Sequence, residues 1–471
     1  METSKLYING SFVPSTGTDR IDVIDSATEE VMGWIPAGTV ADVDLAVKSA
    51  ADAQPEWAAL PQHERSRHLM ALHDELSNQA EFFTTLIARE VGTPIKLGQF
   101  VQVGVAIAAI KDAVDELEAF AWETPLANST IVREPIGVVG AITPWNYPLY
   151  QILLKIAPAM AVGCSVVLKS SEVAPLNAFV IAEAIDRVGF PPGVFNLVTG
   201  FGPVVGEALA SHPLVDAISF TGSTRAGKRV MQLGAETIKR VNLELGGKSA
   251  CVILDDATMT KAVSSGVNNV LLNSGQTCAA WTRMIVPRSR LAEIEGMAVE
   301  AMAKFAPGSP FADGKVIGPL VSAAQRDRVR EYIKGAQDEG ARLLLGGSEQ
   351  PQDLESGYFV LPTIFTDVTP DMTIAREEVF GPVLSIMAVD DDDEAIALAN
   401  ATPYGLHGGV WSEDLERAER VARAMKTGQV DINGGRFNPL APFGGYRQSG
   451  NGRERGHYGL EEFLEIKAIQ H

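Results

Sequence analysis

The sequence predicts an α/β fold that contains two parallel sheets, each covered by helices. From Gly137 to Val241, short segments rich in Val, Ile and Leu alternate with helical patterns, and a second alternation runs from about Ser249 to Val430. This alternation is typical of parallel sheets with helices on their faces. The chain has 471 residues, 46% of them hydrophobic, so it is long enough for two or three domains with buried cores.

The first third of the chain is predicted to be mostly helical. Apolar residues recur at helical spacing over residues 40–53, 62–92 and 96–118, which indicates amphipathic helices. Pro55 and Pro61 separate the first two of these segments, because proline disfavours a helix interior.

Each alternation contains four expected strands. They lie at 138–142, 164–168, 194–198 and 217–220 in the first, and at 251–254, 284–286, 343–345 and 383–386 in the second. A further β-type segment is expected at 129–133. Residues 463–469 alternate in part between apolar and polar, as an edge strand would, and such a terminal strand needs a partner.

The charge and cysteine content exclude several classes of protein. A formal net charge of −20 argues against nucleic acid or an anionic membrane as partner. No apolar run reaches the ~18 residues of a membrane span, and the start of the chain lacks a leader pattern, so we expect the cytoplasm. Cys164, Cys251 and Cys278 are too few for a disulfide framework and show no metal-binding spacing, so we expect reduced thiols and no metal.

The acidic run at 390–394 has two interpretations. Its carboxylates could bind a divalent cation, but it directly precedes the helical pattern at 395–400. Negative charges favour a helix N-terminus, so we predict a solvated helix start.

Cys278 and Glu244 are the candidate reactive pair. A thiolate attacks a carbonyl carbon and leaves from a thioester, and a carboxylate can activate the water that hydrolyses that thioester. An isolated cysteine is more often a small buried hydrophobe. Here the preceding Ser274-Gly-Gln-Thr277 favours a turn and therefore a thiol on a loop.

Seven short motifs occur in order along the chain. They are Thr143-Pro-Trp-Asn-Tyr-Pro-Leu149, Lys169-Ser-Ser-Glu172, Phe220-Thr-Gly-Ser223, Leu243-Glu-Leu-Gly-Gly-Lys248, Gly275-Gln-Thr-Cys278, Glu377-Glu-Val-Phe-Gly-Pro382 and Pro442-Phe-Gly-Gly445. In these motifs and their order the chain resembles the aldehyde dehydrogenase superfamily over nearly its whole length, and seven ordered matches are far more specific than any one of them.

The resemblance implies an oxidoreductase of EC 1.2.1 type that oxidises an aldehyde to the carboxylic acid with NAD(P)+ through a cysteine thiohemiacetal and thioester. It implies a Rossmann-like parallel-sheet cofactor domain, a second α/β catalytic domain and a small β flap for oligomerisation, in a homodimer or homotetramer. The expected ranges are 1–118 and 135–244 for the dinucleotide-binding domain, 245–445 for the catalytic domain, and 119–134 with 458–471 for the flap and the C-terminal strand.

Four residues are expected to carry the chemistry. By resemblance, Cys278 is the nucleophile, Glu244 activates water, and the Asn146 side chain forms an oxyanion hole with the Cys278 backbone N–H. Asn146 could instead bond a turn. Lys155 matches a lysine near the family's catalytic centre, with electrostatic support or proton relay as its role, or it is a surface lysine. His212 and His457 are expected to be structural or exposed.

The cofactor site is expected at the ends of strands in the first domain. The spacing of Gly202 and Gly206 is a weak signal alone, whereas Ser223 stands at a helix N-terminus, where anions bind. Glu172 is expected to bond the adenosine ribose and repel a 2′-phosphate, which favours NAD, although Arg225 and Lys228 leave NADP open. The other expected contacts are Ile142, Thr143, Pro144, Trp145, Lys169, Ser171, Phe220, Thr221, Gly222, Leu245, Gly246, Glu378 and Phe380.

The substrate tunnel is inferred from family positions. Gln151 and Arg436 add polarity to it, and Leu154 stands where some relatives have a bulkier aromatic residue, so an aromatic or medium-chain aldehyde, with a polar or acidic tail as an option, would fit. The expected lining is Tyr147, Gln151, Leu154, Thr277, Ala279, Phe437 and Phe443.

Two other functions remain open from the sequence. A relative that transfers the acyl group to CoA needs no general base at Glu244. A nucleotide-binding structural protein on the same fold would need none of the three central residues, Asn146, Glu244 and Cys278.

Overall fold

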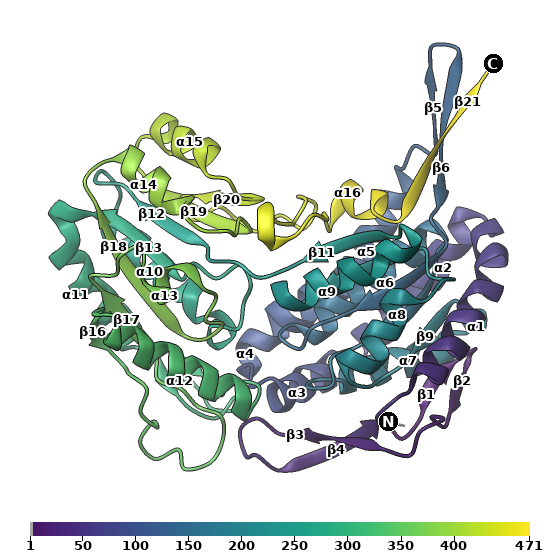
Figure 1. Ribbon diagram of the computed structural model, residues 1–471, viewed down its shortest axis with the longest axis horizontal. Helices are drawn as coiled ribbons and strands as arrows, with labels where there is room; N and C mark the ends of the chain where they lie inside the picture. Colours follow the sequence, from purple (N-terminus) through teal and green to yellow (C-terminus); the bar gives the residue numbers. More distant parts are fainter. Residues whose placement is uncertain (1–2) are drawn as a thin grey trace.

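A computed structural model describes residues 3–471, and it has two α/β lobes with a projecting β flap (Figure 1). The first two residues of the expected 1–118 segment lie outside the described residues. The expected domain boundaries remain predictions, because the structure defines helices, strands and sheets and does not by itself divide the chain into domains.

The first lobe contains a seven-stranded sheet whose order is β11-β10-β7-β8-β9-β1-β2. Strands β11, β10, β7, β8 and β9 run parallel, and the chain passes from β7 outward to β9 before it returns to β10 on the other side. This order is that of a Rossmann fold, with the reversal between β7 and β10. The strands are β1 (Leu6–Ile8), β2 (Ser11–Val13), β7 (Val138–Ile142), β8 (Ser165–Lys169), β9 (Phe195–Leu197), β10 (Ala217–Thr221) and β11 (Arg240–Glu244).

Helices cover both faces of this sheet, and strands β3 (Arg20–Ile24) and β4 (Val31–Pro36) form a separate hairpin. The largest buried apolar cluster lies between the sheet and these helices. The helices are α1 (Val40–Ala59), α2 (Gln62–Ser77), α3 (Ala80–Glu90), α4 (Ile95–Leu97), η1 (Gly98–Gly104), α5 (Val105–Glu118), α6 (Pro148–Val162), α7 (Leu176–Val188), η2 (Gly202–Gly206), α8 (Glu207–Ser211), α9 (Thr224–Gly234) and η3 (Ala235–Thr237).

The N-terminal helices correct three expectations. Helix α1 continues through Pro55 to Ala59, because the Trp57 indole N–H donates to the Met160 carbonyl at 3.0 Å and anchors the last turn in the core. The single helix expected over 62–92 is two helices, α2 and α3, and the one expected over 96–118 includes the π-helical turn η1.

By length and composition alone, the helical segment Ile95–Glu118 could cross a membrane, although no such run was expected. Half of its most apolar part is buried within the protein. Ala106, Ile110 and Leu117 belong to the first core, and α5 packs against α2 and α6. The segment is therefore a core helix in this fold.

The second lobe contains another seven-stranded sheet, with the order β16-β17-β18-β13-β12-β19-β20. Strands β18, β13, β12, β19 and β20 are parallel, and β16 is antiparallel to β17. The strands are β12 (Ala250–Ile253), β13 (Arg283–Pro287), β16 (Arg342–Leu345), β17 (Thr363–Thr366), β18 (Val383–Val389), β19 (His407–Trp411) and β20 (Gln429–Ile432), beside the small pair β14 (Ala306–Pro307) and β15 (Val316–Ile317).

The helices of the second lobe bury three further apolar clusters. The acidic run begins α14, as predicted: Asp391 is its N-cap and accepts a hydrogen bond from the Glu394 N–H. The helices are α10 (Met259–Leu271), η4 (Leu272–Gly275), η5 (Arg288–Arg290), α11 (Leu291–Met302), α12 (Ala323–Asp338), α13 (Thr373–Arg376), α14 (Asp392–Ala399), α15 (Leu415–Ala424) and η6 (Arg447–Ser449). The last helix, α16 (Gly456–Glu461), packs against α5 and α6 of the first lobe.

The flap is a three-stranded sheet of order β21-β6-β5, in which all neighbours are antiparallel. It consists of β5 (Glu123–Leu126), β6 (Ser129–Pro135) and the C-terminal β21 (Leu464–Gln470). It projects away from both lobes (Figure 1). The terminal strand thus has a partner in β6, and its other edge is free within the described chain.

Candidate active site

The candidate site lies where the carboxyl ends of strands in the first sheet meet the amino ends of strands in the second. Strand β11 ends at Glu244 and the chain crosses directly to β12. Because β12 and β13 are parallel neighbours, the loop that enters β13, which carries Cys278, lies close to this crossing. A cavity of about 150 Å³ contains both residues. Its other lining residues are Pro144, Trp145, Asn146, Gln151, Thr221, Gly222, Ser223, Leu245, Gly246, Gln325, Arg328, Glu378 and Phe380.

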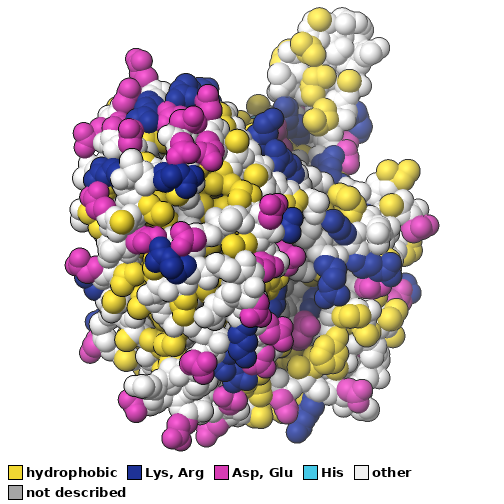
Figure 2. Space-filling view, turned by 60° about the vertical axis from the view of Figure 1, so that its left-hand side comes forward, with side chains coloured by type: hydrophobic (Ala, Val, Ile, Leu, Met, Phe, Trp, Pro, Cys, Tyr) yellow, Lys and Arg dark blue, Asp and Glu magenta, His cyan; other side chains and the backbone are white. Residues whose placement is uncertain are grey.

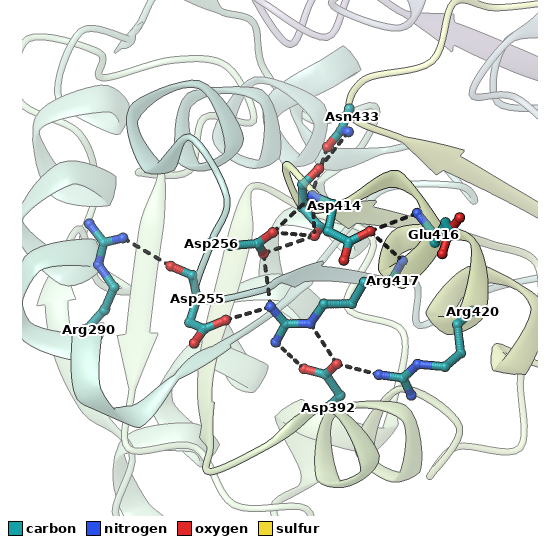
Figure 3. Close-up of polar contacts among 10 residues, drawn as sticks. Asp255, Asp256, Arg290, Asp392, Asp414, Glu416, Arg417, Arg420 and Asn433 are labelled. Carbon is teal, nitrogen blue, oxygen red and sulfur yellow. Dashed lines mark hydrogen bonds and ion pairs between the residues drawn. The ribbon is translucent and has the colours of Figure 1, made fainter.

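A larger hollow of about 630 Å³ lies at the opposite end of the second sheet, far from this chemistry. Its charged residues satisfy one another (Figure 3): Arg417 contacts Asp255, Asp256 and Asp392, and Arg420 also contacts Asp392. This network leaves the central guanidinium occupied, and the hollow contains neither Cys278 nor Glu244, so we assign the site to the smaller cavity.

The loop before Cys278 has an unusual backbone. Asn273, Ser274 and Gly275 all have positive φ, at 51°, 57° and 76°. A Cβ on Gly275 would collide with the Gly381 carbonyl, so glycine is required where the two motifs meet. Non-glycine residues in this conformation are strained, and such strain concentrates at functional sites.

Buried hydrogen bonds hold this loop. The Asn146 side-chain amide donates to the Gln276 carbonyl at 3.1 Å, and the Asn273 amide donates to the Asn146 carbonyl at 2.9 Å. Thr93 donates to the Asn273 side-chain oxygen at 2.6 Å. An amide nitrogen has two hydrogens, so Asn146 bonds the turn and retains a second N–H at the cavity.

Cys278 lies in a turn, as predicted, and is partly exposed, whereas Cys164 and Cys251 are buried. Burial, and then the negative charges of Glu378 and Glu244, raise the pKa of the Cys278 thiol to about 12. The nucleophile is therefore protonated in this state at neutral pH.

Glu244 is buried, and neither of its carboxyl oxygens has a hydrogen-bond partner in the described chain. The backbone of Gly444 lies against it, since a Cβ there would be 2.7 Å from Glu244 Oε1. Burial, and then the charge of Glu454, raise the pKa of Glu244 well above its ordinary value. An unsatisfied buried carboxyl of this kind is free to contact water or a ligand.

Lys155 is buried and is not the surface lysine of the alternative interpretation. Its ammonium donates to Glu454 Oε1 at 2.6 Å, and both side chains are at most 10% exposed. The positive charge of Lys155 lowers the pKa of Glu244 and so opposes Glu454. Sequence reasoning missed Glu454, because 299 positions separate it from Lys155.

The expected cofactor residues lie along the first sheet's carboxyl edge. Lys169 donates to Glu172 at 2.6 Å, with the lysine buried and the glutamate 29% exposed. Ser223 is the N-cap of α9 and accepts from the Ala226 N–H. Lys228 is bonded to Gln448. Gly202 and Gly206 bound the π-helical turn η2 after β9.

The structure supports a fit of these residues to a dinucleotide. The hydroxyls of Thr221 and Ser170 are buried without a partner in the described chain, and Thr221 lines the cavity. Helix α9 presents its N-terminus at the reversal between β7 and β10, where open α/β sheets bind nucleotides.

Glu378 and Phe380 form the wall opposite Asn146. Glu378 accepts from the Gly247 N–H at 3.0 Å, and burial raises its pKa to about 7. Phe380 has a φ of 62°, which is rare for a bulky residue, and its ring meets Trp145 edge to face with centroids 5.3 Å apart. Helix α12 supports this wall: Gln325 donates to the Phe380 carbonyl and Arg328 to the Glu378 carbonyl.

Gln325 and Arg328 were not predicted. They lie on α12 and contact the Glu377-to-Pro382 motif. No spacing in the sequence connects this helix with that motif, so only the three-dimensional packing reveals their role.

The expected tunnel residues do not all share one cavity. Gln151 lies in the Cys278 cavity, and the Tyr147 hydroxyl lies 2.7 Å from Thr277 Oγ1. Leu154 lines a neighbouring cavity instead. Phe443 is buried and Phe437 is half exposed, while Ala279 is partly exposed beside Cys278. Arg436 is exposed.

Comparison with known proteins gives consistent matches over the whole chain. A sequence model described as "Aldehyde dehydrogenase family" matches residues 12–469. A 3-succinoylsemialdehyde-pyridine dehydrogenase from a Pseudomonas species is 48% identical over 99% of this chain and 98% of its own.

Solved structures are similar as well. A cysteine-to-alanine mutant of aldehyde dehydrogenase C from Pseudomonas syringae, in complex with NAD+ and octanal, has a TM-score of 0.98 at 45% identity over 99% of this chain and 96% of that one. Betaine aldehyde dehydrogenase from Staphylococcus aureus, in complex with NAD+, has a TM-score of 0.94 at 36% identity over 99% and 97%.

Proposed function

Because this chain belongs to the aldehyde dehydrogenase family, we propose that it oxidises an aldehyde to the carboxylic acid through a thioester on Cys278. The observation that carries the proposal is the cavity shared by Cys278, Glu244 and Asn146. It brings a thiol, an unpaired carboxyl and an amide donor to one place.

Cys278 acts first, in its thiolate form. Attack on the aldehyde carbon moves negative charge to the oxygen, and the free N–H of Asn146, together with the Cys278 backbone N–H, stabilises that charge. The hydrogen bond to Gln276 fixes the amide before the reaction. Loss of one such donor typically slows the reaction by about 100- to 1,000-fold.

Glu244 acts on the thioester. Its carboxylate takes a proton from water, the resulting hydroxide attacks the acyl carbon, and the acid leaves as Cys278 regains its thiolate. A raised pKa makes Glu244 a stronger base once it is ionised, and Lys155 keeps the ionised form accessible. We assign Lys155 electrostatic support, with Glu454 as its positioning partner.

The cofactor is NAD. When bound, it supplies the acceptor for the hydride that leaves the aldehyde carbon. The residues that would hold it are those at the carboxyl edge of the first sheet, the α9 N-terminus with Ser223, and Glu378 with Phe380. Glu172 is partly exposed beside Lys169, and its charge disfavours a 2′-phosphate.

The substrate class is an aromatic or medium-chain aldehyde, with a polar or acidic tail as an option. The similar structures support this range, since one is a complex with octanal and one relative is named for a pyridine semialdehyde.

We also propose a homodimer or homotetramer, located in the cytoplasm. The free edge of β21 supports assembly, and the three free cysteines suit a reducing compartment.

An assay of NADH production from a panel of aldehydes, with and without CoA, tests the function. We expect NADH and free acid without CoA. Strict dependence on CoA would establish the acylating alternative, and no NADH from any aldehyde would leave only a nucleotide-binding role.

A further inference from the structure

Arg455 occupies a position that the proposed chemistry does not use. It follows Glu454, has a φ of 76°, and its guanidinium lies among three aromatic rings. The guanidinium carbon is 4.6 Å from the centroid of Phe437, 4.9 Å from Phe443 and 5.5 Å from Tyr150. Cation–π contact of this kind stabilises a guanidinium that has lost part of its water.

The charge of Arg455 has no ion-pair partner in the described chain. Its Nε atom is buried without a hydrogen-bond partner, and its polar neighbour is the Tyr150 hydroxyl. Asp112 is the one other charged residue on the same small cavity. Burial, and then the charge of Asp115, raise the pKa of Asp112, and the charge of Arg455 lowers it, but these two described side chains form no ion pair. An unpaired, partly desolvated guanidinium in a chain of net charge −20 is a site for an anion.

Helix α6 and the segment Phe443–Gly444 connect Arg455 to the reactive centre. Tyr147, the N-cap of α6, contacts Thr277 next to Cys278. Within α6, Gln151 lines the Cys278 cavity, and Tyr150 and Leu154 line the Arg455 cavity. These positions share one helix face. Phe443 precedes Gly444, which lies against Glu244, and its backbone N–H and carbonyl pair with those of Glu454 at 2.9 and 2.7 Å.

The spacing along α6 sets the length of ligand that would reach Arg455. From Tyr147 to Leu154 the helix rises about 10 Å. The small cavity beside Arg455, at the Leu154 end of this span, is lined by Val105, Ala109 and Leu154, which suit methylene groups. A carboxylate is the group that matches the planar donor fork of an arginine.

We propose that Arg455 is a specificity-determining residue that binds a carboxylate at the far end of the aldehyde, so that the enzyme prefers ω-oxo carboxylic acids over neutral aldehydes of equal length. The proposal rests on the proposed function, since it assumes that Cys278 attacks the aldehyde end. The competing interpretation is structural: Arg455 braces the loop with Phe437 and Phe443 through ring contacts alone.

The test compares kcat/KM for a series of unbranched ω-oxo carboxylic acids with that for their methyl esters and for n-alkanals of the same length. In the wild type the acid should be preferred at one chain length. Arg455→Met should lower the acid-to-ester ratio by about 10- to 100-fold, mainly through KM, because a hydrogen-bonded charge pair is lost. Arg455→Lys should restore part of the ratio.

Arg436→Met is the matched control, because Arg436 is exposed and adjoins Phe437. It should leave the ratio within about twofold of the wild type, the discrimination expected without a lost charge pair. The midpoints of thermal unfolding identify any variant that fails to fold. If Arg455→Met fails to fold, the acid-to-ester ratio of Arg455→Lys decides between carboxylate binding and a structural role.

A wild type without preference for the acid, an unchanged ratio in Arg455→Met, or equal losses for acid and ester would each overturn the proposal. In each case oxidation of neutral aldehydes would leave the proposed function standing. A wild type that oxidises no aldehyde with NAD+ would instead overturn the proposed function itself.

Discussion

At the scale of single residues, the central feature is that burial raises the pKa of both the nucleophile and the base. The pKa of Cys278 is raised to about 12 and that of Glu244 is also raised. Because each group acts in its ionised form, both gain activity as pH rises. The same negative neighbours that protect the thiol from ionisation also protect it from oxidation at rest.

Alkylation of the free enzyme by iodoacetamide should report this pKa. We expect the rate of Cys278 modification to rise about tenfold per pH unit from about pH 7 to 9, since the thiolate fraction does so below the pKa. Peptide mass spectrometry measures the rate, with Cys278→Ala as control. A rate that is already level near pH 7 would contradict the raised pKa, and faster labelling of Cys164 or Cys251 would contradict the assignment.

The residues that could be predicted are those in motifs with defined chemistry. Cys278, Glu244 and Asn146 do line one cavity, and Lys169 does contact Glu172. Glu454, Gln325 and Arg328 could not be predicted, because their contacts to the site depend on how distant elements pack. Arg436 was singled out for polarity, but it is exposed, and the arginine among the tunnel aromatics is Arg455.

At the scale of elements, periodicity predicted which segments are helices and strands but not where helices break. No proline or glycine lies between α2 and α3 to indicate that one helix ends and another begins there. Pro55 does not end α1, because Trp57 anchors the turn beyond it. Tertiary contacts overrode local preference in both cases.

Helix α3 ends at Glu90, a fully buried carboxyl that caps the start of α7. It accepts from the Leu176 N–H at 2.9 Å and from Asn177 Nδ2 at 2.8 Å. Burial raises its pKa to about 8. The unfolded chain releases this proton near its ordinary pKa, so the folded state loses stability between about pH 4.5 and 8, by up to about 5 kcal/mol.

Glu90→Gln should remove this dependence, because an amide does not titrate and Asn177 can turn its unpaired oxygen toward the new N–H. We expect the apparent melting temperature of the wild type to fall more between about pH 6 and 9 than that of the variant. Parallel curves of melting temperature against pH for the two proteins would show that ionisation of Glu90 does not destabilise the folded state.

At the scale of the whole molecule, two seven-stranded sheets face the site with opposite ends. The carboxyl edge of the first provides cofactor contacts, and the amino edge of the second provides the loop with Cys278. The strand alternation predicted two sheets, but only the three-dimensional arrangement shows which ends meet.

The flap is the second feature at this scale. It stands clear of the body with hydrophobic side chains on its surface (Figure 2), among which Leu126, Ile466 and Ile469 are 62%, 69% and 44% exposed. Replacing Ile466 and Ile469 by Asp should convert a wild-type oligomer into a 50.3 kDa monomer, because charges on an edge strand block pairing. Light scattering after gel filtration measures the mass, and a monomeric wild type would contradict assembly through the flap.

The central claim is that Cys278 carries a thioester which Glu244 helps water to hydrolyse, and Glu244→Gln tests it most directly. The amide keeps the size of the carboxyl but cannot accept the proton from water. Rapid mixing of this variant with NAD+ and an aldehyde should give a burst of NADH approaching one per site, then slow turnover, with an acyl group on Cys278 in the mass spectrum. If the burst is slow, a higher pH should restore it by supplying thiolate. An unchanged steady-state rate, or no burst and no acylated Cys278 at any pH, would contradict the account.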